Sequence, residues 1–325
     1  MIAAHEPHRL QLRMLRMMIR NRCLLHRGSA GVGTEKAPSS LMANIINRLV
    51  KRLPPIHRLI LQRDELLAAM RQLHRMCSPP GHFSSPIPSL AEIQAYAAKF
   101  QHGCDQPPAG IELCAAEQLE LFERLRLLCE ELPFTADSSP AHRYYYNNPW
   151  FCRHDAMVLC AMLRHLRPCR VIEVGSGFSS AAMLDINDLF LDQSTRFTFI
   201  EPNPERLDSL LASRDRRSAA IYRQRVQEID LTIFEELESG DILFIDSSHI
   251  SRMGSDLNHL VFNVLPRLKV GVHIHFHDIY YPFEYPPQLL LDGQYWNEAY
   301  LLRAFLQYNK AFRIELFSSW IWPRG

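Results

Sequence analysis

The stretch Val171-Ile-Glu-Val-Gly-Ser-Gly-Phe-Ser-Ser180 decides the fold of this 325-residue chain. Its β-branched first half predicts a strand, a Gly-x-Gly turn follows, and a helix is expected to begin at Ser179. Glycines let the backbone turn tightly and approach a ligand closely, and the N-terminus of a helix offers N–H groups that no helical carbonyl accepts. The stretch therefore predicts a nucleotide-type site where a first strand ends.

Outward from this stretch, short apolar runs alternate with helical patterns from about residue 144 to the end. We expect strands at Arg170–Val174, Arg196–Glu201, Ala220–Val226, Asp241–Asp246, Gly271–His277 and Phe312–Phe317. We expect helices at Asp155–Leu166, Ser179–Phe190, Pro204–Ser213, Leu231–Leu237, Gly254–Leu265 and Asn297–Tyr308. Right-handed crossovers then predict an α/β, Rossmann-like, doubly wound and mostly parallel sheet. Either Ser318–Trp322 adds a final strand or the C-terminal end of the sheet is shortened.

Two regions precede this predicted domain of residues 144–325. Residues 1–40 are predicted to be a basic, poorly ordered leader, because 12 Lys and Arg stand against 2 acidic residues between Met1 and Arg63. Met42 is a second candidate for the start of the native chain. Residues 41–143 are predicted to be helical, with helices at Leu41–Leu53, Ile56–Met76, Ser89–Phe100 and Ala115–Leu132. This helical region either packs on the next domain, covers an active site or joins copies of the chain into a homo-oligomer.

The composition excludes several classes of protein. A hydrophobic content of 47%, a charged content of 22% and a net charge of +1 are typical of a soluble globular protein without a polyanionic partner. No aromatic residues are interleaved with the arginines of the leader, so we expect no nucleic-acid binding. The eight cysteines form no CxxC pair, which argues against a structural zinc site. With no apolar run long enough to span a membrane and no signal peptide, a cytoplasmic location is expected.

Two acidic residues indicate which nucleotide the predicted site takes. Glu173 lies two positions before Gly175, where a negative charge suits a cationic ligand and not a pyrophosphate. Glu201 ends the next strand, 26 positions after Gly175, where a carboxylate can accept two hydrogen bonds from a ribose diol. Ser180 occupies the position of the third glycine of the dinucleotide pattern. These features favour S-adenosylmethionine over NAD.

Three motifs together resemble the class I S-adenosylmethionine-dependent methyltransferase family. They are Glu173-Val-Gly-Ser-Gly-Phe-Ser-Ser, Phe199-Ile-Glu-Pro and Asp241-Ile-Leu-Phe-Ile-Asp-Ser-Ser-His249, within about Asn147–Trp320. The chain is similar in particular to bacterial members in which an Asp-Ser-Ser-His segment is followed by His-Asp-Ile. The resemblance implies that Glu173, Gly175 and Gly177 line the methionine and ribose parts of the cofactor, that Glu201 holds the ribose and that Gln227 lies near the adenine. Ser179 and Asp246 complete the predicted cofactor-binding set.

Polar side chains that follow the fourth and fifth predicted strands are candidates for the chemistry. His249 and His277 are the predicted catalytic bases, because an imidazole can accept a proton near neutral pH. Alternatively, these side chains could bind a divalent cation. Metal-dependent O-methyltransferases of the catechol type resemble this layout, which implies Asp246 and Asp278 as metal ligands with His277 beside them. His273 and His275 are expected to be core or interface residues.

The predicted function is transfer of a methyl group to an oxygen or nitrogen of a small-molecule or glycan-like acceptor. Aromatic residues between Tyr280 and Trp296 could contact such an acceptor or simply pack in an interface. An NAD-dependent oxidoreductase is the first alternative, disfavoured by Glu173 and Ser180. The second is a module that binds the cofactor, or serves as a scaffold, without catalysis.

Overall fold

Five parallel strands form one sheet in the order β3-β2-β1-β4-β5. In a computed structural model, residues 54–73, 78–100 and 107–321 are described; the predicted leader of residues 1–40 and the predicted helix Leu41–Leu53 lie outside them. The strands are β1 Arg170–Val174, β2 Arg196–Ile200, β3 Ala220–Tyr222, β4 Ile242–Ile245 and β5 His273–Phe276. The predicted Rossmann-like, doubly wound sheet is confirmed, and β1 has the predicted bounds.

The helices before, between and after the strands follow most of the predicted helical patterns. They are α3 Pro54–Leu73, α4 Leu90–Lys99, α5 Ala115–Cys129, α6 Arg153–Leu166, α7 Phe178–Phe190, α8 Glu205–Leu210, α9 Asp215–Ser218, α10 Thr232–Glu235, α11 Asp256–His259, α12 Pro287–Leu291, α13 Glu298–Leu306 and α14 Ser318–Ile321. A π-helical turn at Leu260–Val264 continues α11, and short 3-10 turns lie at Val226–Glu228 and Leu265–Arg267. No helix of the described residues has both the length and the apolar character needed to cross a membrane.

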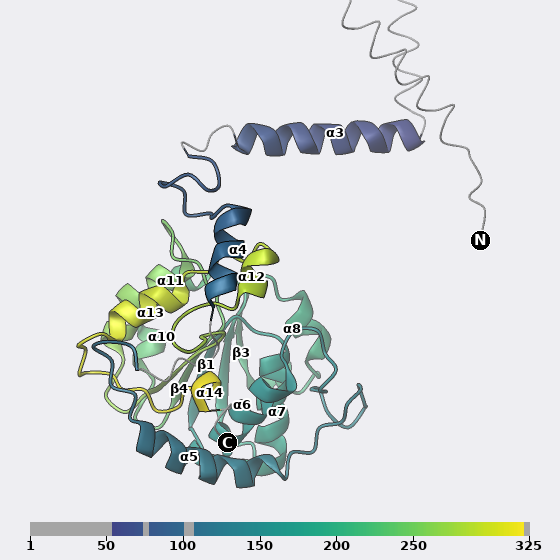
Figure 1. Ribbon diagram of the computed structural model, residues 1–325. Helices are drawn as coiled ribbons and strands as arrows, with labels where there is room; N and C mark the ends of the chain where they lie inside the picture. The colour runs from purple at the N-terminus through teal and green to yellow at the C-terminus, as the bar shows by residue number, and fades with distance from the viewer. Residues whose placement is uncertain (1–53, 74–77, 101–106, 322–325) are drawn as a thin grey trace, which may run out of the picture. The chain divides into compact units, whose positions relative to one another are not determined.

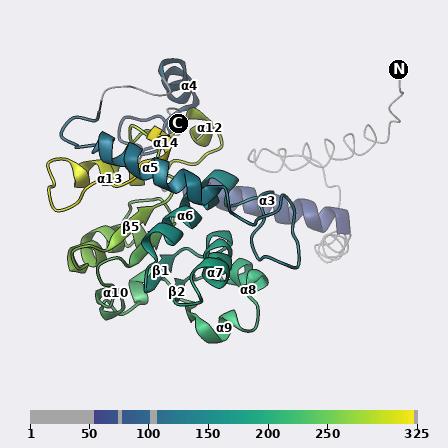
Figure 2. The same ribbon diagram turned by 90° about the horizontal axis from the view of Figure 1, so that it is seen from below.

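Side chains along the strands point alternately to the two faces of the sheet, and a layer of helices covers each face (Figures 1 and 2). Val171 and its neighbours on one face pack against α6, α7 and α8 in one buried cluster. Ile172 and Val174 on the other face pack against α10, α11, the π-helical turn and α13. Because both faces are covered, the central strands β1 and β4 are almost continuously apolar. Glu173, which points to the first face, is the exception that matters for the site.

The prediction of a sixth strand at Phe312–Phe317 is wrong. Of the two alternatives for the C-terminal end of the sheet, a strand at Ser318–Trp322 is not formed by the described residues 318–321. Residues 312–317 form no ladder, and Ser318–Ile321 is the helix α14. The side chains of Phe312, Ile314 and Leu316 alternate with charged residues because they pack on neighbouring helices; the Phe312 ring, for example, lies 4.9 Å from that of Phe305 in α13. The sheet therefore ends at β5, which has a free edge.

Contacts divide the chain into two compact units, Met1–Cys77 and Ser78–Gly325. In the first, the described part is α3, whose prolines lie in its first turn, where a missing N–H costs nothing. In the second, α4 begins with a full capping box between Ser89 and Glu92. The helices α4 and α5, predicted to belong to a separate helical region, are in the same compact unit as the sheet.

Gln118 of α5 ties the C-terminal segment to this unit. Its Oε1 accepts a hydrogen bond from the Phe317 N–H at 2.6 Å, and its amide donates to the Leu113 carbonyl. The side chain is fully buried, so both partners are needed to offset its removal from water. The segment after α13 is thus anchored to α5 while it runs past β5.

Arg143 is a buried cross-link between α7 and α9. Its guanidinium contacts Asp185 and Asp215 at 2.6 Å each and Asp188 at 2.9 Å, with 9% of the side chain exposed. Burial lowers the pKa of Arg143, but the hydrogen bonds that the guanidinium donates to these carboxylates outweigh it and raise the pKa. The three acidic residues fix the loop before α6 against the first helix layer.

Candidate functional site

The carboxyl ends of β1, β4 and β5 meet at one edge of the sheet. Backbone hydrogen bonds join them in sequence: Asp246 N donates to Val174 O at 2.8 Å, and His277 N donates to Ile245 O at 2.9 Å. Gly175 N in turn donates to Ile200 O at the end of β2. The polar residues that follow these strands are therefore brought to one edge, as the sequence predicts.

Gly175 is required by a close approach between two strand ends. Its φ is +83°, and a Cβ added there would lie 1.8 Å from the carbonyl oxygen of Asp246. Gly177 differs, because its φ of 178° is ordinary extended backbone. A Cβ at Gly177 would lie 3.1 Å from the Arg206 side chain. The first glycine therefore joins β1 to β4, whereas the second leaves space beside a flexible arginine.

Glu173 lies beneath the turn and is completely buried. Its Oε1 accepts a hydrogen bond from the Ser179 hydroxyl at 2.5 Å, and its Oε2 accepts one from the Ser180 hydroxyl. Burial raises the pKa of Glu173 to about 8, in spite of these hydrogen bonds. The carboxyl group thus connects β1 to the first turn of α7 and holds the shape of the Gly-x-Gly turn.

Glu201 lies at the end of β2 and faces the same turn. Its Oε2 accepts a hydrogen bond from the Ser176 N–H at 3.0 Å, and its Oε1 accepts one from the Asn203 N–H at 2.7 Å. Each carboxylate oxygen keeps a lone pair for a further donor. The group is half-buried, and its position relative to the turn suits a diol placed between the ends of β1 and β2.

Four buried oxygens near this edge have no hydrogen-bond partner among the described residues. They are Oγ of Ser176, Oε1 of Gln227, Oγ of Ser247 and Oε1 of Glu298. The amide nitrogen of Gln227 donates to the Gly254 carbonyl at 2.9 Å, which fixes the orientation of the side chain. Because buried polar atoms are nearly always paired, these oxygens are candidates for hydrogen bonds with a bound molecule.

His249 is held between two carboxylates. Its Nδ1 lies 2.6 Å from Glu298 Oε2, and its Nε2 lies 3.3 Å from Asp246 Oδ1. Burial opposes its charge, but the hydrogen bonds to Asp246 and Glu298 outweigh it and raise the pKa of His249 to about 10. Trp296 covers the ring, with 4.4 Å between the ring centroids. At neutral pH this imidazole is a cation that keeps both protons.

Asp246, His277 and Asp278 form a compact group of metal-ligating side chains. One ligand atom from each lies within 4.8 Å of the others. The hydrogen bond from His249 and the nearby imidazoles hold the pKa of Asp246 below its ordinary value despite burial, whereas burial raises the pKa of Asp278. Two carboxylates and one imidazole suit a divalent transition metal better than they suit magnesium.

His277 is buried and is oriented by its neighbours. Its Nδ1 lies 3.4 Å from Nε2 of His275, and its Nε2 points toward Asp278 and Asp155, at 3.8 and 4.0 Å. His275 stacks on Phe244, with ring centroids 4.1 Å apart, and burial together with His277 lowers the pKa of His275 to about 3. A neutral His275 Nε2 can accept a hydrogen bond from His277 Nδ1, and this contact orients the His277 ring with its Nε2 toward the acidic group.

Apart from Gln227, which lies in the 3-10 turn after β3, the predicted site residues fall into two adjoining groups. Glu173, Gly175, Gly177, Ser179 and Glu201 surround the turn after β1, and Asp246, His249, His277 and Asp278 lie at the ends of β4 and β5. Gly175 touches both groups through Asp246. Their roles toward a ligand stay predictions. His273, expected to be a core or interface residue, lies away from both groups and pairs with Glu315 at 2.6 Å.

Glu298 and Asp155 are parts of the site that sequence reasoning missed. Glu298 begins α13, 49 positions after His249, and an acidic residue there is ordinarily explained by the helix dipole. Asp155 likewise lies in the first turn of α6. The aromatic residues after β5 have two different roles. Tyr281, Phe283 and Tyr285 are core residues, whereas the Tyr280 hydroxyl donates a hydrogen bond to Asp278 at 3.3 Å.

Comparisons with known proteins agree with the arrangement at this edge. A family model described as a methyltransferase domain matches residues 172–279, from within β1 to just beyond β5. An uncharacterized protein of Archaeoglobus fulgidus is 37% identical over 173 residues, which cover 50% of this chain and 75% of that protein. Residues 172–279, which the family model matches, contain both groups of side chains, whereas Glu298 and Asp155 lie outside this range.

Proposed function

This chain belongs to the class I S-adenosylmethionine-dependent methyltransferase family, and from that premise we propose that it transfers a methyl group to an oxygen or nitrogen of a small-molecule or glycan-like acceptor. The observation that carries the proposal is the turn Gly175–Gly177, which lies between the acidic residues Glu173 and Glu201 at the carboxyl edge of the sheet. The chemistry supplied by bound S-adenosylmethionine is an electrophilic methyl group on a sulfonium.

The donor set at this edge fits that cofactor. In our proposal Glu201 receives the ribose hydroxyls, and the unpaired Gln227 Oε1 accepts a hydrogen bond from the adenine amino group. Gly175, Gly177 and Ser179 shape the turn against the methionine part, and the buried Glu173 supports that turn through its hydrogen bonds with Ser179 and Ser180. Asp246, whose pKa is held below its ordinary value, contributes negative charge near a cationic ligand. No pyrophosphate is expected here, because the carboxylates of Glu201 and Asp246 would repel it.

We further propose that Asp246, His277 and Asp278 hold a divalent cation beside the acceptor. These residues would bind the ion through two carboxylate oxygens and Nε2 of His277. An ion at this place would orient an acceptor hydroxyl and lower its pKa. Without an ion, His277 Nε2 is the group best placed to accept the acceptor proton, because His249 already keeps both of its protons at neutral pH.

His249 has a positioning role in this proposal. Its imidazolium holds Asp246 from one side and is itself held by the buried Glu298. The cation offsets part of the negative charge of the acidic group, so that the group keeps its geometry in the free protein.

Calorimetric titration tests the cofactor assignment. We expect S-adenosylmethionine and S-adenosylhomocysteine to bind and NAD not to bind. Glu201→Gln should weaken S-adenosylhomocysteine about tenfold, through loss of charge-assisted hydrogen bonds to the ribose. Glu205→Gln, a change at a neighbouring acidic residue in α8, is the matched control and should leave the affinity unchanged. Binding of NAD alone would support the oxidoreductase instead, and cofactor binding without transfer to any acceptor would support a non-catalytic module.

Paramagnetic resonance of added Mn²⁺ tests the cation site separately. Asp278→Asn should weaken Mn²⁺ by at least about tenfold, as expected for loss of a charged ligand. Asp292→Asn, at an exposed residue after α12, should have no effect. Equal Mn²⁺ affinity in the two variants would refute the cation site and leave the cofactor assignment standing.

A further inference from the structure

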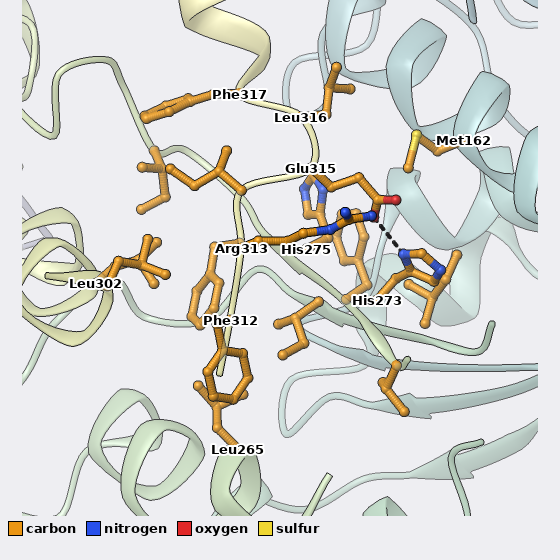
Figure 3. Close-up of a pocket in the computed structure, with 18 of the residues that line it drawn as sticks. Met162, Leu265, His273, His275, Leu302, Phe312, Arg313, Glu315, Leu316 and Phe317 are labelled. Carbon is orange, nitrogen blue, oxygen red and sulfur yellow. Dashed lines mark hydrogen bonds and ion pairs between the residues drawn. The ribbon is translucent and has the colours of Figure 1, made fainter. Parts of the chain in front are cut away.

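A cavity lies against β5, away from the residues of the candidate site. It has a volume of about 520 Å³, and its walls come from α6, β5, α13 and residues 311–318. Figure 3 shows Met162, Leu302, Phe312 and Phe317 around it, with His273 and His275 on the strand side. Cavities of this size are typical of sites for small ligands. Asp246, His249, His277 and Asp278 do not line it, so it is separate from the proposed methyl-transfer site.

The strand that forms one wall has backbone groups without partners. His273 N donates to Asp241 O and His277 N donates to Ile245 O, so the odd-numbered residues of β5 bond to β4. Ladder geometry then directs the N–H and C=O groups of Ile274 and Phe276 to the other edge. Both residues line the cavity, and no other described segment bonds to their main chain. Backbone groups in such surroundings are rarely left unpaired.

One end of the cavity carries a cation. Arg313 is the only Lys or Arg among its lining residues, and within the described part of the chain it has no ion pair or hydrogen bond. The neighbouring carboxylate of Glu315 is already held by His273, at 2.6 Å. Because Glu315 contacts the first residue of β5, Arg313 lies toward the amino-terminal end of that strand (Figure 3). A planar guanidinium with unused donors is suited to a carboxylate.

We propose that this cavity binds a short apolar peptide as an added antiparallel strand on β5, with the free C-terminal carboxylate of the peptide at Arg313. Backbone pairing would satisfy Ile274 and Phe276, and the apolar walls would receive the alternating side chains of the peptide. The antiparallel direction follows from the position of Arg313, since the carboxyl end of the peptide must lie at the amino-terminal end of β5. An alkyl chain would fill the same walls but would leave the strand edge unpaired.

Calorimetric titration with acetyl-Leu-Val-Leu, carrying a free carboxylate, tests the proposal. We expect saturable binding that is unchanged by saturating S-adenosylhomocysteine. The same peptide with N-methylated backbone nitrogens should not bind, because it cannot donate to the strand edge. The C-terminal amide of the peptide, and the variant Arg313→Gln, should each weaken binding about tenfold. Lys310→Gln, at an exposed cation three positions earlier, is the control and should bind normally.

Three results would overturn the proposal. The first is absence of saturable binding by the unmodified peptide, and the second is equal binding by the N-methylated peptide. The third is competition with S-adenosylhomocysteine, which would place the peptide in the methyl-transfer cleft. Decanoate is the alternative probe: if decanoate binds and the peptide does not, the cavity takes apolar carboxylic acids and the strand edge is irrelevant. None of these results depends on whether the protein methylates an acceptor.

Discussion

At the scale of single residues, the contact between Gly175 and the Asp246 carbonyl joins the two halves of the site. Gly240 provides a natural comparison, because it has a similar positive φ of +88° but no heavy atom within 4 Å of an added Cβ. The two glycines therefore separate the conformational cost of an added side chain from its steric cost.

We predict that Gly240→Ala lowers the free energy of unfolding by about 1–2 kcal/mol, the cost of a left-handed conformation. Gly175→Ala should lower it by about 3 kcal/mol or more, because the new methyl group must also displace the end of β4. Urea unfolding measures both values. Equal losses in the two variants would show that the close approach is not rigid.

Glu173 leads to a prediction about pH. Burial raises its pKa to about 8, so the native state binds the proton more tightly than the unfolded state does. This contribution to stability is fully present below the ordinary pKa of a glutamate and is lost as pH rises through 8. Glu173→Gln, which imitates the protonated acid, should match wild type near pH 5 and exceed it by on the order of a few kcal/mol near pH 9. Urea unfolding at the two pH values measures the difference. The control variant Glu205→Gln should show no such gain in stability at pH 9.

At the scale of elements, the predictions from periodicity were most accurate where one element covers another completely. The strand β1 and the helix α6 were predicted to within two residues because their apolar faces are continuous. The sixth strand failed because Phe312, Ile314 and Leu316 alternate with charged residues for a different reason, namely contact with helices. Alternation of apolar and charged residues indicates that one side of a segment is buried, but it does not indicate whether a strand or a helix covers that side.

The site shows the same division between what is local and what is not. The Gly-x-Gly turn, Asp246 and Asp278 follow strand ends, so their meeting could be predicted from the order of elements. Glu298 could not be predicted as the partner of His249, because 49 residues and two helices separate them. The orientation of His277 likewise depends on a ring contact between Phe244 and His275 on neighbouring strands, which no local pattern encodes.

The cross-link through Arg143 allows a prediction at this scale. Arg143→Met leaves Asp185 buried without a cation and Asp215 with only the exposed Arg214 at 3.7 Å, and we expect a loss of about 3–5 kcal/mol in unfolding free energy. The matched control is Arg167→Met, whose partner Asp192 is 93% exposed, and it should cost less than about 1 kcal/mol. Thermal or urea unfolding compares them. A small loss for Arg143→Met would mean that water replaces the guanidinium.

At the scale of the whole molecule, the division after Cys77 separates the site from the first unit. Every residue of the candidate site lies within Ser78–Gly325, whereas α3 exposes Leu59, Leu61, Leu66 and Leu67. Exposed leucines on a helix are typical of an interface. Of the three roles that the sequence leaves open for the helical N-terminal region, we therefore propose that it joins copies of the chain.

We predict that the full chain sediments as a homo-oligomer, and that a chain of residues 78–325 sediments as a monomer with unchanged affinity for S-adenosylhomocysteine. The substitution of Leu59 and Leu66 by Gln in the full chain should have the same effect on sedimentation as the truncation. If the truncated chain stays oligomeric, the interface belongs to the second unit. If it loses affinity for the nucleoside, the first unit supports the site.

The main-chain contact between Gly175 and Asp246 also bears on selectivity. In the proposed function the turn after β1 would hold the methyl donor and the ends of β4 and β5 would hold the acceptor, and main-chain atoms alone separate these two parts. The distance between donor and acceptor would then be set by the fold before any substrate binds. We therefore expect acceptors to be selected by the length and bulk that place their nucleophile at this distance.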